Sequence, residues 1–339
     1  DPPGHQEVEL GLVKLYRATG ERRYLDQARF FLERRGDAAG HKLYGVYAQD
    51  HVPVLEQKEA VGHAVRAGYM YSAMADVTAL SGDEAYRPAL SALWEDVVAR
   101  KLYLTGGLGA RRENEGYGDA YELPNLTGYA ETCAAIAGAM WNHRMFLLEG
   151  DARYLDVLER ILYNGFLSGV SLDGERFFYP NPLAADGKRA FNQRQKGRSE
   201  WFDCSCCPTN VVRFLPSIPG YAYAHRGRDV YVNLFLAGRG ALDVDGVAVS
   251  LRQDTRYPWD GRVRIAVDPA RPAELALRVR VPGWAQGRPV PSDLYRYADG
   301  ATPPWSVRVN GQAATPTLDK GFAVLRRTWK KGDVVELDL

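Results

Sequence analysis

Four cysteines in two short segments are the first sign of chemistry in this chain. Cys204, Cys206 and Cys207 fall within four residues, and Cys133 lies well upstream of them. Neighbouring cysteines bridge poorly, because a disulfide needs converging Cβ vectors and Cα atoms about 4.4–6.8 Å apart. Clustered thiols that do not crosslink usually hold a metal ion or take part in a reaction. We therefore expect a metal site or reactive thiols here.

A carboxylate beside the upstream cysteine widens the set of possible ligands. Glu131 precedes Cys133 by two residues, and with Cys206 and Cys207 it makes one carboxylate and three thiols, a plausible four-coordinate zinc set. The spacing differs from the paired C-x₂-C knuckles of zinc ribbons. Three readings remain open from the residues alone: a closed structural zinc site, inert buried thiols, or a catalytic site.

A second candidate region is the long polar segment between two expected helices. It begins at the glycine-rich stretch from Thr105 and continues to about Asn125. Loops of this length inside a compact domain are often functional. Its acidic residues are candidate general acids, with solvated loop charges as the alternative reading: Glu113, Glu115, Asp119 and Glu122. No Lys-Ser/Thr pair follows the glycines, so a phosphate-binding loop is excluded.

Two further residues could line a pocket. His63 follows Gly62 in a segment that we expect to be the middle of a helix, where a glycine costs about 1 kcal/mol and indicates a close approach or a pocket. A lone helical histidine is more often a core or rim residue than a ligand. Tyr179, in an aromatic stretch before Pro180, is either a core residue or a ring and hydroxyl at a cleft.

Composition narrows the class of protein. The chain has 339 residues, a net charge of +1, 46% hydrophobic and 25% charged residues, which are values typical of globular proteins. We therefore expect no nucleic-acid partner and no membrane partner. No apolar run is long enough for a membrane span, and residues 1–30 carry no signal-peptide pattern. Few, clustered thiols favour a reducing compartment, and a cytoplasmic location is expected.

The first part of the chain predicts a repeat of helical hairpins. In each unit a helix ends at a glycine, an acidic residue follows, and a tyrosine packs the corner before the next helix. The three glycines, 62 and 68 residues apart, are Gly20, Gly82 and Gly150. The expected helices after the first pair span 59–80, 86–100, 131–148 and 153–168. Such hairpins commonly stack into an α/α toroid, and three hairpins are half of a six-hairpin ring.

The second part predicts strands. One more helix is expected over 208–223, with Pro208 in its first turn. From Asp229 the pattern is β, with turns such as Asn310-Gly311. The expected strands, which suggest a β-sandwich, span 230–235, 262–267, 275–281, 306–309, 322–325 and 334–339. The predicted fold class is therefore α+β multidomain: part of an (α/α)6 barrel over 1–225, then a β-sandwich over 226–339 that is incomplete at its end.

Three strings of residues carry a resemblance to a known family. They are Glu59-Ala-Val-Gly-His63-Ala-Val-Arg-Ala, Tyr129-Ala-Glu131-Thr-Cys133-Ala and Trp201-Phe-Asp-Cys-Ser-Cys206-Cys207-Pro-Thr-Asn210. With these, the chain resembles glycoside hydrolase family 127, the β-L-arabinofuranosidases and their relatives, over essentially its whole length. The resemblance implies an (α/α)6 barrel with β-sandwich domains, truncated here at both ends.

The resemblance also implies roles. Glu131, Cys133, Cys206 and Cys207 would be the ligands of a Zn²⁺ cofactor. Cys206 would also be the nucleophile, and Glu115, sixteen residues before Glu131, the general acid/base. His63 and Tyr179 would contact the sugar, and Cys204 would be a bystander.

The implied activity is a retaining exo-glycosidase that hydrolyses β-L-arabinofuranosides. The expected partner is a small oligosaccharide or glycoside, and a homodimer is left open. Two alternatives are a glycosidase of the same scaffold acting on another plant-polysaccharide sugar, and a non-catalytic carbohydrate-binding protein with a structural zinc.

Overall fold

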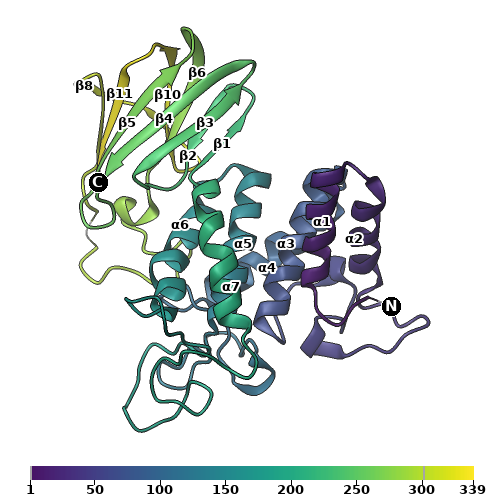
Figure 1. Ribbon diagram of the computed structural model, residues 1–339. Coiled ribbons are helices and arrows are strands. Elements are labelled where there is room, and N and C mark those ends of the chain that lie inside the picture. Colours follow the sequence, from purple (N-terminus) through teal and green to yellow (C-terminus); the bar gives the residue numbers. More distant parts are fainter. Residues whose placement is uncertain (1, 301) are drawn as a thin grey trace. The chain divides into compact units, whose positions relative to one another are not determined.

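The computed structural model describes residues 2–300 and 302–339 and divides into two compact units (Figure 1). The first unit comprises the residues up to Glu149, together with Val157–Phe214 and Ser292–Leu294. The second comprises Gly150–Asp156, Leu215–Pro291 and the residues from Tyr295 onward. The first is helical and the second is built on β-sheets, so the predicted mixture of helices and sheets in more than one domain is confirmed.

The helices are α1 (Glu7–Thr19), α2 (Arg22–Arg34), α3 (Ala64–Ser81), α4 (Arg87–Asp96), α5 (Thr132–Glu149), α6 (Ala152–Arg160) and α7 (Cys206–Phe214). Helix α1 packs on α3, α3 on α5, and α5 on α7, so these four lie in one row. Two helices continue as π-turns, α4 over Val97–Lys101 and α6 over Ile161–Phe166. A long irregular segment separates Lys101 from α5, as the sequence predicts.

Two helices of the row, α3 and α5, are buried on nearly all sides. Both are apolar around their whole circumference rather than along one stripe, which is typical of a helix covered by neighbours everywhere. Small residues let the pair approach closely: a Cβ added at Gly68 would lie 2.8 Å from the Cβ of Ala137. The Trp94 indole donates to the Asn142 amide oxygen at 2.8 Å and ties α4 to the same α5.

The predicted glycine repeat is confirmed. Gly20, Gly82 and Gly150 all have left-handed backbones, with φ of 74°, 74° and 67°. A residue with a side chain rarely adopts this conformation, so each glycine ends its helix and lets the chain reverse. The predicted start of the second hairpin is wrong: α3 begins at Ala64, and the segment from residue 59 to His63 is not helical.

The second unit contains two sheets. Their strands are β1 (Tyr223–Arg226), β2 (Asp229–Val232), β3 (Gly238–Val244), β4 (Val247–Thr255), β5 (Arg262–Pro269), β6 (Ala273–Arg280), β7 (Ser306–Val309), β8 (Gln312–Ala314), β9 (Thr317–Asp319), β10 (Phe322–Trp329) and β11 (Asp333–Asp338). One sheet has the order β1-β2-β6-β10-β9 and the other β3-β4-β5-β11-β7-β8. All pairs are antiparallel except β2 with β6.

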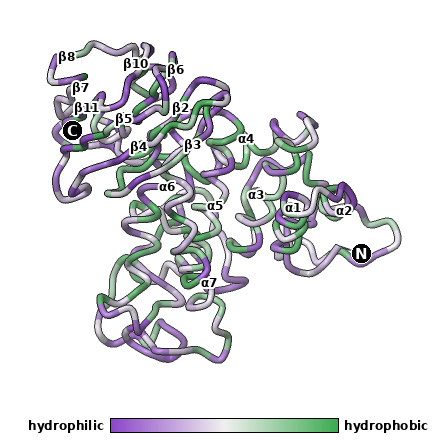
Figure 2. The backbone as a smooth tube through the Cα atoms, turned by 45° about the horizontal axis from the view of Figure 1, so that its top comes forward, coloured by the Kyte–Doolittle hydropathy of each residue, from purple (hydrophilic) through white to green (hydrophobic). Residues whose placement is uncertain are grey.

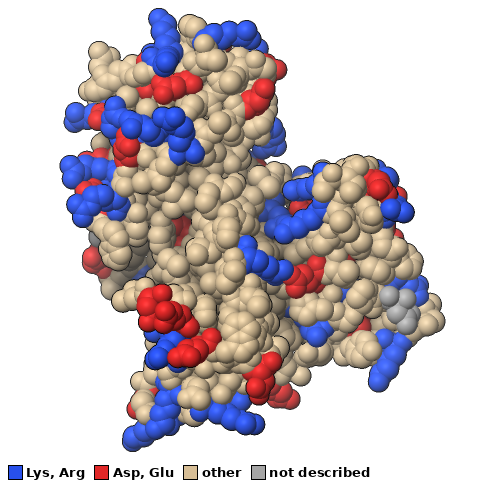
Figure 3. Space-filling model, viewed as in Figure 1, with Lys and Arg blue, Asp and Glu red and all other residues tan. Residues whose placement is uncertain are grey.

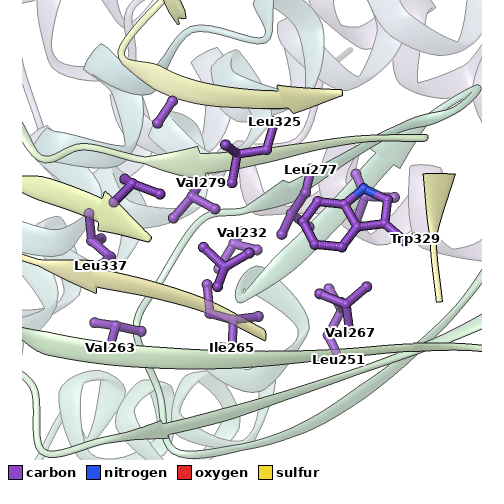
Figure 4. Close-up of a cluster of buried hydrophobic side chains, with 14 of the residues drawn as sticks. Val232, Leu251, Val263, Ile265, Val267, Leu277, Val279, Leu325, Trp329 and Leu337 are labelled. Atoms are coloured by element: carbon purple, nitrogen blue, oxygen red, sulfur yellow. The ribbon is translucent and has the colours of Figure 1, made fainter. Parts of the chain in front are cut away.

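The core of this unit lies between the sheets, as Figure 4 shows. Side chains from the first sheet, among them Leu277 and Trp329, face side chains from the second, among them Ile265 and Leu251. Two facing sheets with a shared apolar core fit the predicted β-sandwich. The buried Trp329 indole N–H donates a hydrogen bond to the Leu275 carbonyl at 3.2 Å, so this donor is not left unpaired.

The sequence prediction is incomplete at the junction of the two patterns. Helix α7 starts at Cys206, two residues earlier than predicted, and ends at Phe214, and β1 begins at Tyr223. Strands β1, β8 and β9, of three or four residues each, are absent from the prediction. Strands β3 and β4 are absent as well: Gly238 and Gly240 interrupt the apolar alternation in β3, but the alternation of Val247, Val249 and Leu251 in β4 was overlooked. The turn between β3 and β4 was a further signal: Asp245-Gly246, with φ of 55° and 74°, is a tight hairpin connection.

Hydrophobic and hydrophilic residues alternate along the chain (Figure 2), and one face of the molecule carries charges of both signs (Figure 3). Figure 2 shows hydrophobic segments recurring along the tube between hydrophilic ones. On the face drawn in Figure 3, acidic and basic side chains are interspersed. Among the residues described, none of the helices combines the length and the apolar character that crossing a membrane requires.

Candidate active site

The N-terminal ends of the four helices in the row meet at one cavity of about 390 Å³. His5 and Glu7 come from the start of α1, His63 directly precedes α3, Glu131 directly precedes α5, and Cys206 is the first residue of α7. Helix N-termini carry partial positive charge and stabilise anionic groups by about 0.3–1 kcal/mol each. The fold therefore places these thiols and carboxylates next to the partial positive charge of helix ends.

The four predicted metal ligands lie together. One donor atom from each of Glu131, Cys133, Cys206 and Cys207 falls within 4.8 Å of all the others. Glu131 Oε1 is 3.4 Å from Cys207 Sγ and 3.6 Å from Cys206 Sγ, and the last two sulfurs are 3.9 Å apart. Cys133, Cys207 and Glu131 are buried, and Cys206 is partly exposed to the cavity.

These distances fit a tetrahedral zinc ion. With Zn–S of about 2.3 Å and Zn–O of about 2.1 Å, tetrahedral ligands would lie about 3.8 Å apart for two sulfurs and about 3.6 Å for sulfur and oxygen. The second oxygen of Glu131, Oε2, is buried without a hydrogen-bond partner among the described residues. An unpaired buried carboxylate oxygen is costly, and a cation would remove that cost. The residues present therefore fit the metal that the resemblance implies.

Burial and mutual hydrogen bonds shift the pKa values of three groups in this cluster. Burial, followed by the nearby charges of Cys206 and Glu115, raises the pKa of Glu131 well above its usual range. Burial likewise raises the pKa of Cys207. Hydrogen bonds from the Cys133 and Cys207 thiols lower the pKa of Cys206 to about 2. Cys206, the thiol with the lowered pKa, is the one that reaches the cavity and is only partly buried.

Glu115 lies beside this cluster with both oxygens engaged. The Tyr129 hydroxyl donates to Oε1 at 2.6 Å, and His63 Nε2 lies 2.9 Å from Oε2. Burial by itself would raise the pKa of Glu115, but the hydrogen bonds from His63 and Tyr129 outweigh it and lower the pKa below its usual value. The other acidic candidates of the loop are elsewhere: Asp119 and Glu122 pair with Arg111, and Glu113 does not line the cavity.

The prediction that His63 sits in mid-helix is wrong. Gly62 has a φ of 68°, and a Cβ at that position would lie 1.9 Å from the Val46 carbonyl oxygen, so the helix cannot extend back through it. His63 therefore occupies the residue just before α3, with 7% of its surface exposed and its ring edge-on to Tyr47. Gly62 does mark a close approach next to the cavity: the backbone just before α3 lies against the Val46 carbonyl.

Tyr179 and Cys204 both line the cavity. The Tyr179 ring is buried and packs edge-on against Tyr129 and Phe202, at centroid distances of 6.3 Å and 5.8 Å. Its backbone carbonyl accepts from the Thr132 N–H at 3.0 Å, which ties this aromatic segment to the start of α5. Cys204 is exposed, and the group of mutually close donor atoms does not include it.

Several cavity residues escaped the sequence analysis. Tyr129 does not line the cavity but contacts Glu115, and nothing in its spacing in the string around Glu131 pointed to that contact. The cavity-lining residues that the sequence analysis did not single out are His5, Glu7, Tyr47, Val65, Arg66, Tyr69, Thr209, Asn210 and Arg213. Tyr69 accepts hydrogen bonds from Asn210 and Arg213, both at 2.8 Å, across α3 and α7. Contacts between helices so distant in sequence leave no local pattern.

Comparison with known proteins now decides the family. Residues 2–220 match the family model described as beta-L-arabinofuranosidase, GH127 catalytic domain. The chain belongs to glycoside hydrolase family 127. Residues 229–339 match the model for the GH127 middle domain. The resemblance read from the three strings is thereby confirmed.

Named relatives agree with this assignment. A non-reducing end beta-L-arabinofuranosidase of Bifidobacterium longum subsp. longum is 34% identical over 99% of this chain and 52% of its own length. A solved GH127 beta-arabinofuranosidase is 51% identical, with a TM-score of 0.94 over 100% of this chain and 52% of that one. A GH127 beta-L-arabinofuranosidase from Geobacillus stearothermophilus T6 is 40% identical, with a TM-score of 0.89, over 99% of this chain and 54% of its own. The chain thus spans about half the length of these relatives.

Proposed function

We propose that this family 127 protein is a retaining exo-glycosidase that hydrolyses β-L-arabinofuranosides. One observation carries the proposal: the Cys206 thiol and the Glu115 carboxyl line the same cavity. A nucleophile and an acid/base facing one pocket are what a retaining glycosidase requires. The activities for which the relatives are named supply the sugar. In this proposal, residues 1–225 contribute to an (α/α)6 catalytic barrel and 226–339 to a β-sandwich domain.

Glu131, Cys133, Cys206 and Cys207 would hold a zinc ion. When bound, zinc keeps a coordinated thiol deprotonated at neutral pH. The helix N-terminus under Cys206 acts in the same direction. The two chemical steps of the reaction are carried out by the chain's own side chains.

In the first step, Cys206 Sγ attacks the anomeric carbon as Glu115 gives a proton to the departing glycosidic oxygen. In the open site His63 and Tyr129 lower the pKa of Glu115, so in this proposal the carboxyl takes up that proton when the sugar covers it and removes it from water. A carbon–sulfur bond forms, the carbon–oxygen bond breaks, and the configuration inverts. In the second step, Glu115 takes a proton from the water that displaces the sulfur. The second inversion restores the original configuration.

The other predicted pocket residues support these steps in two ways. His63 Nε2 contacts Glu115 Oε2, so we assign His63 two roles. It holds this carboxyl in place, and it forms part of the pocket wall. Tyr179 offers a largely buried ring and a hydroxyl to the cavity. Burial, followed by the charge of Glu131, raises the pKa of this hydroxyl, which keeps its proton for donation.

The test is hydrolysis of p-nitrophenyl β-L-arabinofuranoside, followed by NMR of the anomer first released. We expect release of p-nitrophenol and a β-configured product. A panel of other aryl furanosides and pyranosides is the control for the sugar. Turnover of another member only would replace the substrate, and no turnover on any member would favour a carbohydrate-binding protein with a structural zinc.

A further inference from the structure

The Tyr129 hydroxyl holds one oxygen of the Glu115 carboxyl. Its hydroxyl donates to Glu115 Oε1 at 2.6 Å, a short and charge-assisted distance. The tyrosine has 5% of its surface exposed, whereas the Glu115 side chain has 30%. A buried donor thus holds a carboxyl that reaches into the cavity.

The backbone around Tyr129 is itself fixed. Its N–H donates to the Ala110 carbonyl at 3.3 Å, and its carbonyl accepts from the Asn181 N–H at 2.9 Å. The next residue, Ala130, has a left-handed φ of 42° and donates to the Gly109 carbonyl at 2.7 Å. The phenol is therefore anchored to two different loops before it meets Glu115.

Glu115 needs such an anchor, because its own backbone is strained. Asn114 and Glu115 both have left-handed φ, of 56° and 48°. Residues other than glycine occupy that region at a cost, and they do so mostly where neighbouring structure holds them. The two hydrogen bonds from Tyr129 and His63 are the side-chain contacts that hold the carboxyl.

We propose that Tyr129 is a positioning residue for Glu115, an inference that rests on the proposed glycosidase function. By donating to Oε1, the phenol fixes the rotation of the Glu115 carboxyl about its Cγ–Cδ bond. The phenol thereby fixes the direction in which Oε2 points. Tyr129 does not need to touch the substrate for this.

A purely structural role is the competing explanation, and Tyr117 offers a comparison. Tyr117 lies two residues from Glu115, is equally buried at 6%, and its hydroxyl has no hydrogen-bond partner among the described residues. A buried tyrosine in this loop therefore does not need a carboxylate partner. The contact of Tyr129 with Glu115 is specific to that residue.

The experiment compares two leaving groups in wild type, Tyr129→Phe, Tyr117→Phe and Glu115→Gln. Aryl glycosides with a p-nitrophenyl group leave with little acid assistance, whereas methyl β-L-arabinofuranoside needs a proton. We expect Tyr129→Phe to lose about 10- to 100-fold in kcat/KM on the methyl glycoside and only a few-fold on the aryl glycoside, because misplacing an acid costs about this much. Tyr117→Phe should match wild type on both.

The ratio of the two kcat/KM values does not depend on how much protein is folded, so a partly unfolded variant still gives an answer. In a Glu115→Gln background, Tyr129→Phe should change the ratio no further, because the two act as one unit. An unchanged ratio in Tyr129→Phe, or an equal change in Tyr117→Phe, would overturn the inference. Absence of turnover in wild type would instead count against the proposed function.

Discussion

The Glu131 carboxyl lies 3.4 Å from the Cys207 thiol, although 76 residues separate them in the chain. Glu131 directly precedes α5, and Cys207 is the second residue of α7. Their contact therefore exists only because the starts of these two helices are packed side by side. Both side chains are buried, and the other carboxyl oxygen of Glu131 has no partner among the described residues. A cation held between them would satisfy both groups.

Metal content should follow the four predicted ligands. We expect protein purified under reducing conditions to hold about one zinc ion per chain, and Cys207→Ser or Glu131→Gln to lose most of it, because each removes one of four donors. Elemental analysis measures the content, and a chelator should lower the Tm of wild type more than that of these variants. Cys204→Ser is the matched control and should keep its zinc. Zinc bound equally by Cys207→Ser would remove this cysteine from the set.

Replacing Cys206 should stop turnover, whereas replacing Cys204 should not. We expect Cys206→Ala to lower kcat/KM on the aryl arabinofuranoside by about 10⁴-fold or more, because the attacking atom is gone. Cys204→Ser should retain most of the activity, because its thiol is exposed and outside the ligand group. Circular dichroism and zinc content of each variant separate loss of the nucleophile from loss of the fold or the metal. Substantial turnover by folded Cys206→Ala would contradict the assignment.

Gly62→Ala should damage both stability and the placement of His63. The new Cβ would meet the Val46 carbonyl oxygen at 1.9 Å, in a left-handed backbone. We expect the free energy of unfolding to fall by about 2–4 kcal/mol, the sum of the left-handed strain and a steric clash. Gly20→Ala is the control: its φ is 74°, but the space around its Cβ is open, so about 1 kcal/mol is expected. Urea unfolding measures both, and equal losses would refute the role of the clash.

His5 should make the protein less stable in mild acid. Burial and then the charge of Arg66 lower the pKa of His5 to about 4, from 6.5. Its Nδ1 accepts from the Glu7 N–H at 3.3 Å, which requires that nitrogen to be unprotonated. The unfolded chain takes up a proton below about pH 6.5 and the folded chain resists until about pH 4, so stability falls with pH across this window. His5→Asn should reduce that fall in urea titrations at pH 7, 5.5 and 4.5. An identical pH dependence in the two proteins would show that another group is responsible.

Much of the architecture was predictable because local signals agree with the tertiary structure. The glycines at 20, 82 and 150 end helices whatever surrounds them, since the left-handed conformation is a property of the residue. Most strands of the second unit were predicted because β-branched residues alternate along them. Strand β3 was missed where glycines interrupt that alternation, and β4 was missed although Val247, Val249 and Leu251 alternate along it. The start of α3 was misplaced because an apolar stretch continues through Gly62.

The sequence by itself determined the donor types, one carboxylate and a cluster of thiols, and through them the family. Only the tertiary structure decided how those donors meet. In the tertiary structure Gly62 has a left-handed backbone and lies against the Val46 carbonyl, so α3 does not extend back through it. His63, the next residue, contacts Glu115. The tertiary structure also brought Tyr129 onto the other oxygen of Glu115. Such contacts join elements far apart in the chain, and their energies depend on packing that no local pattern encodes.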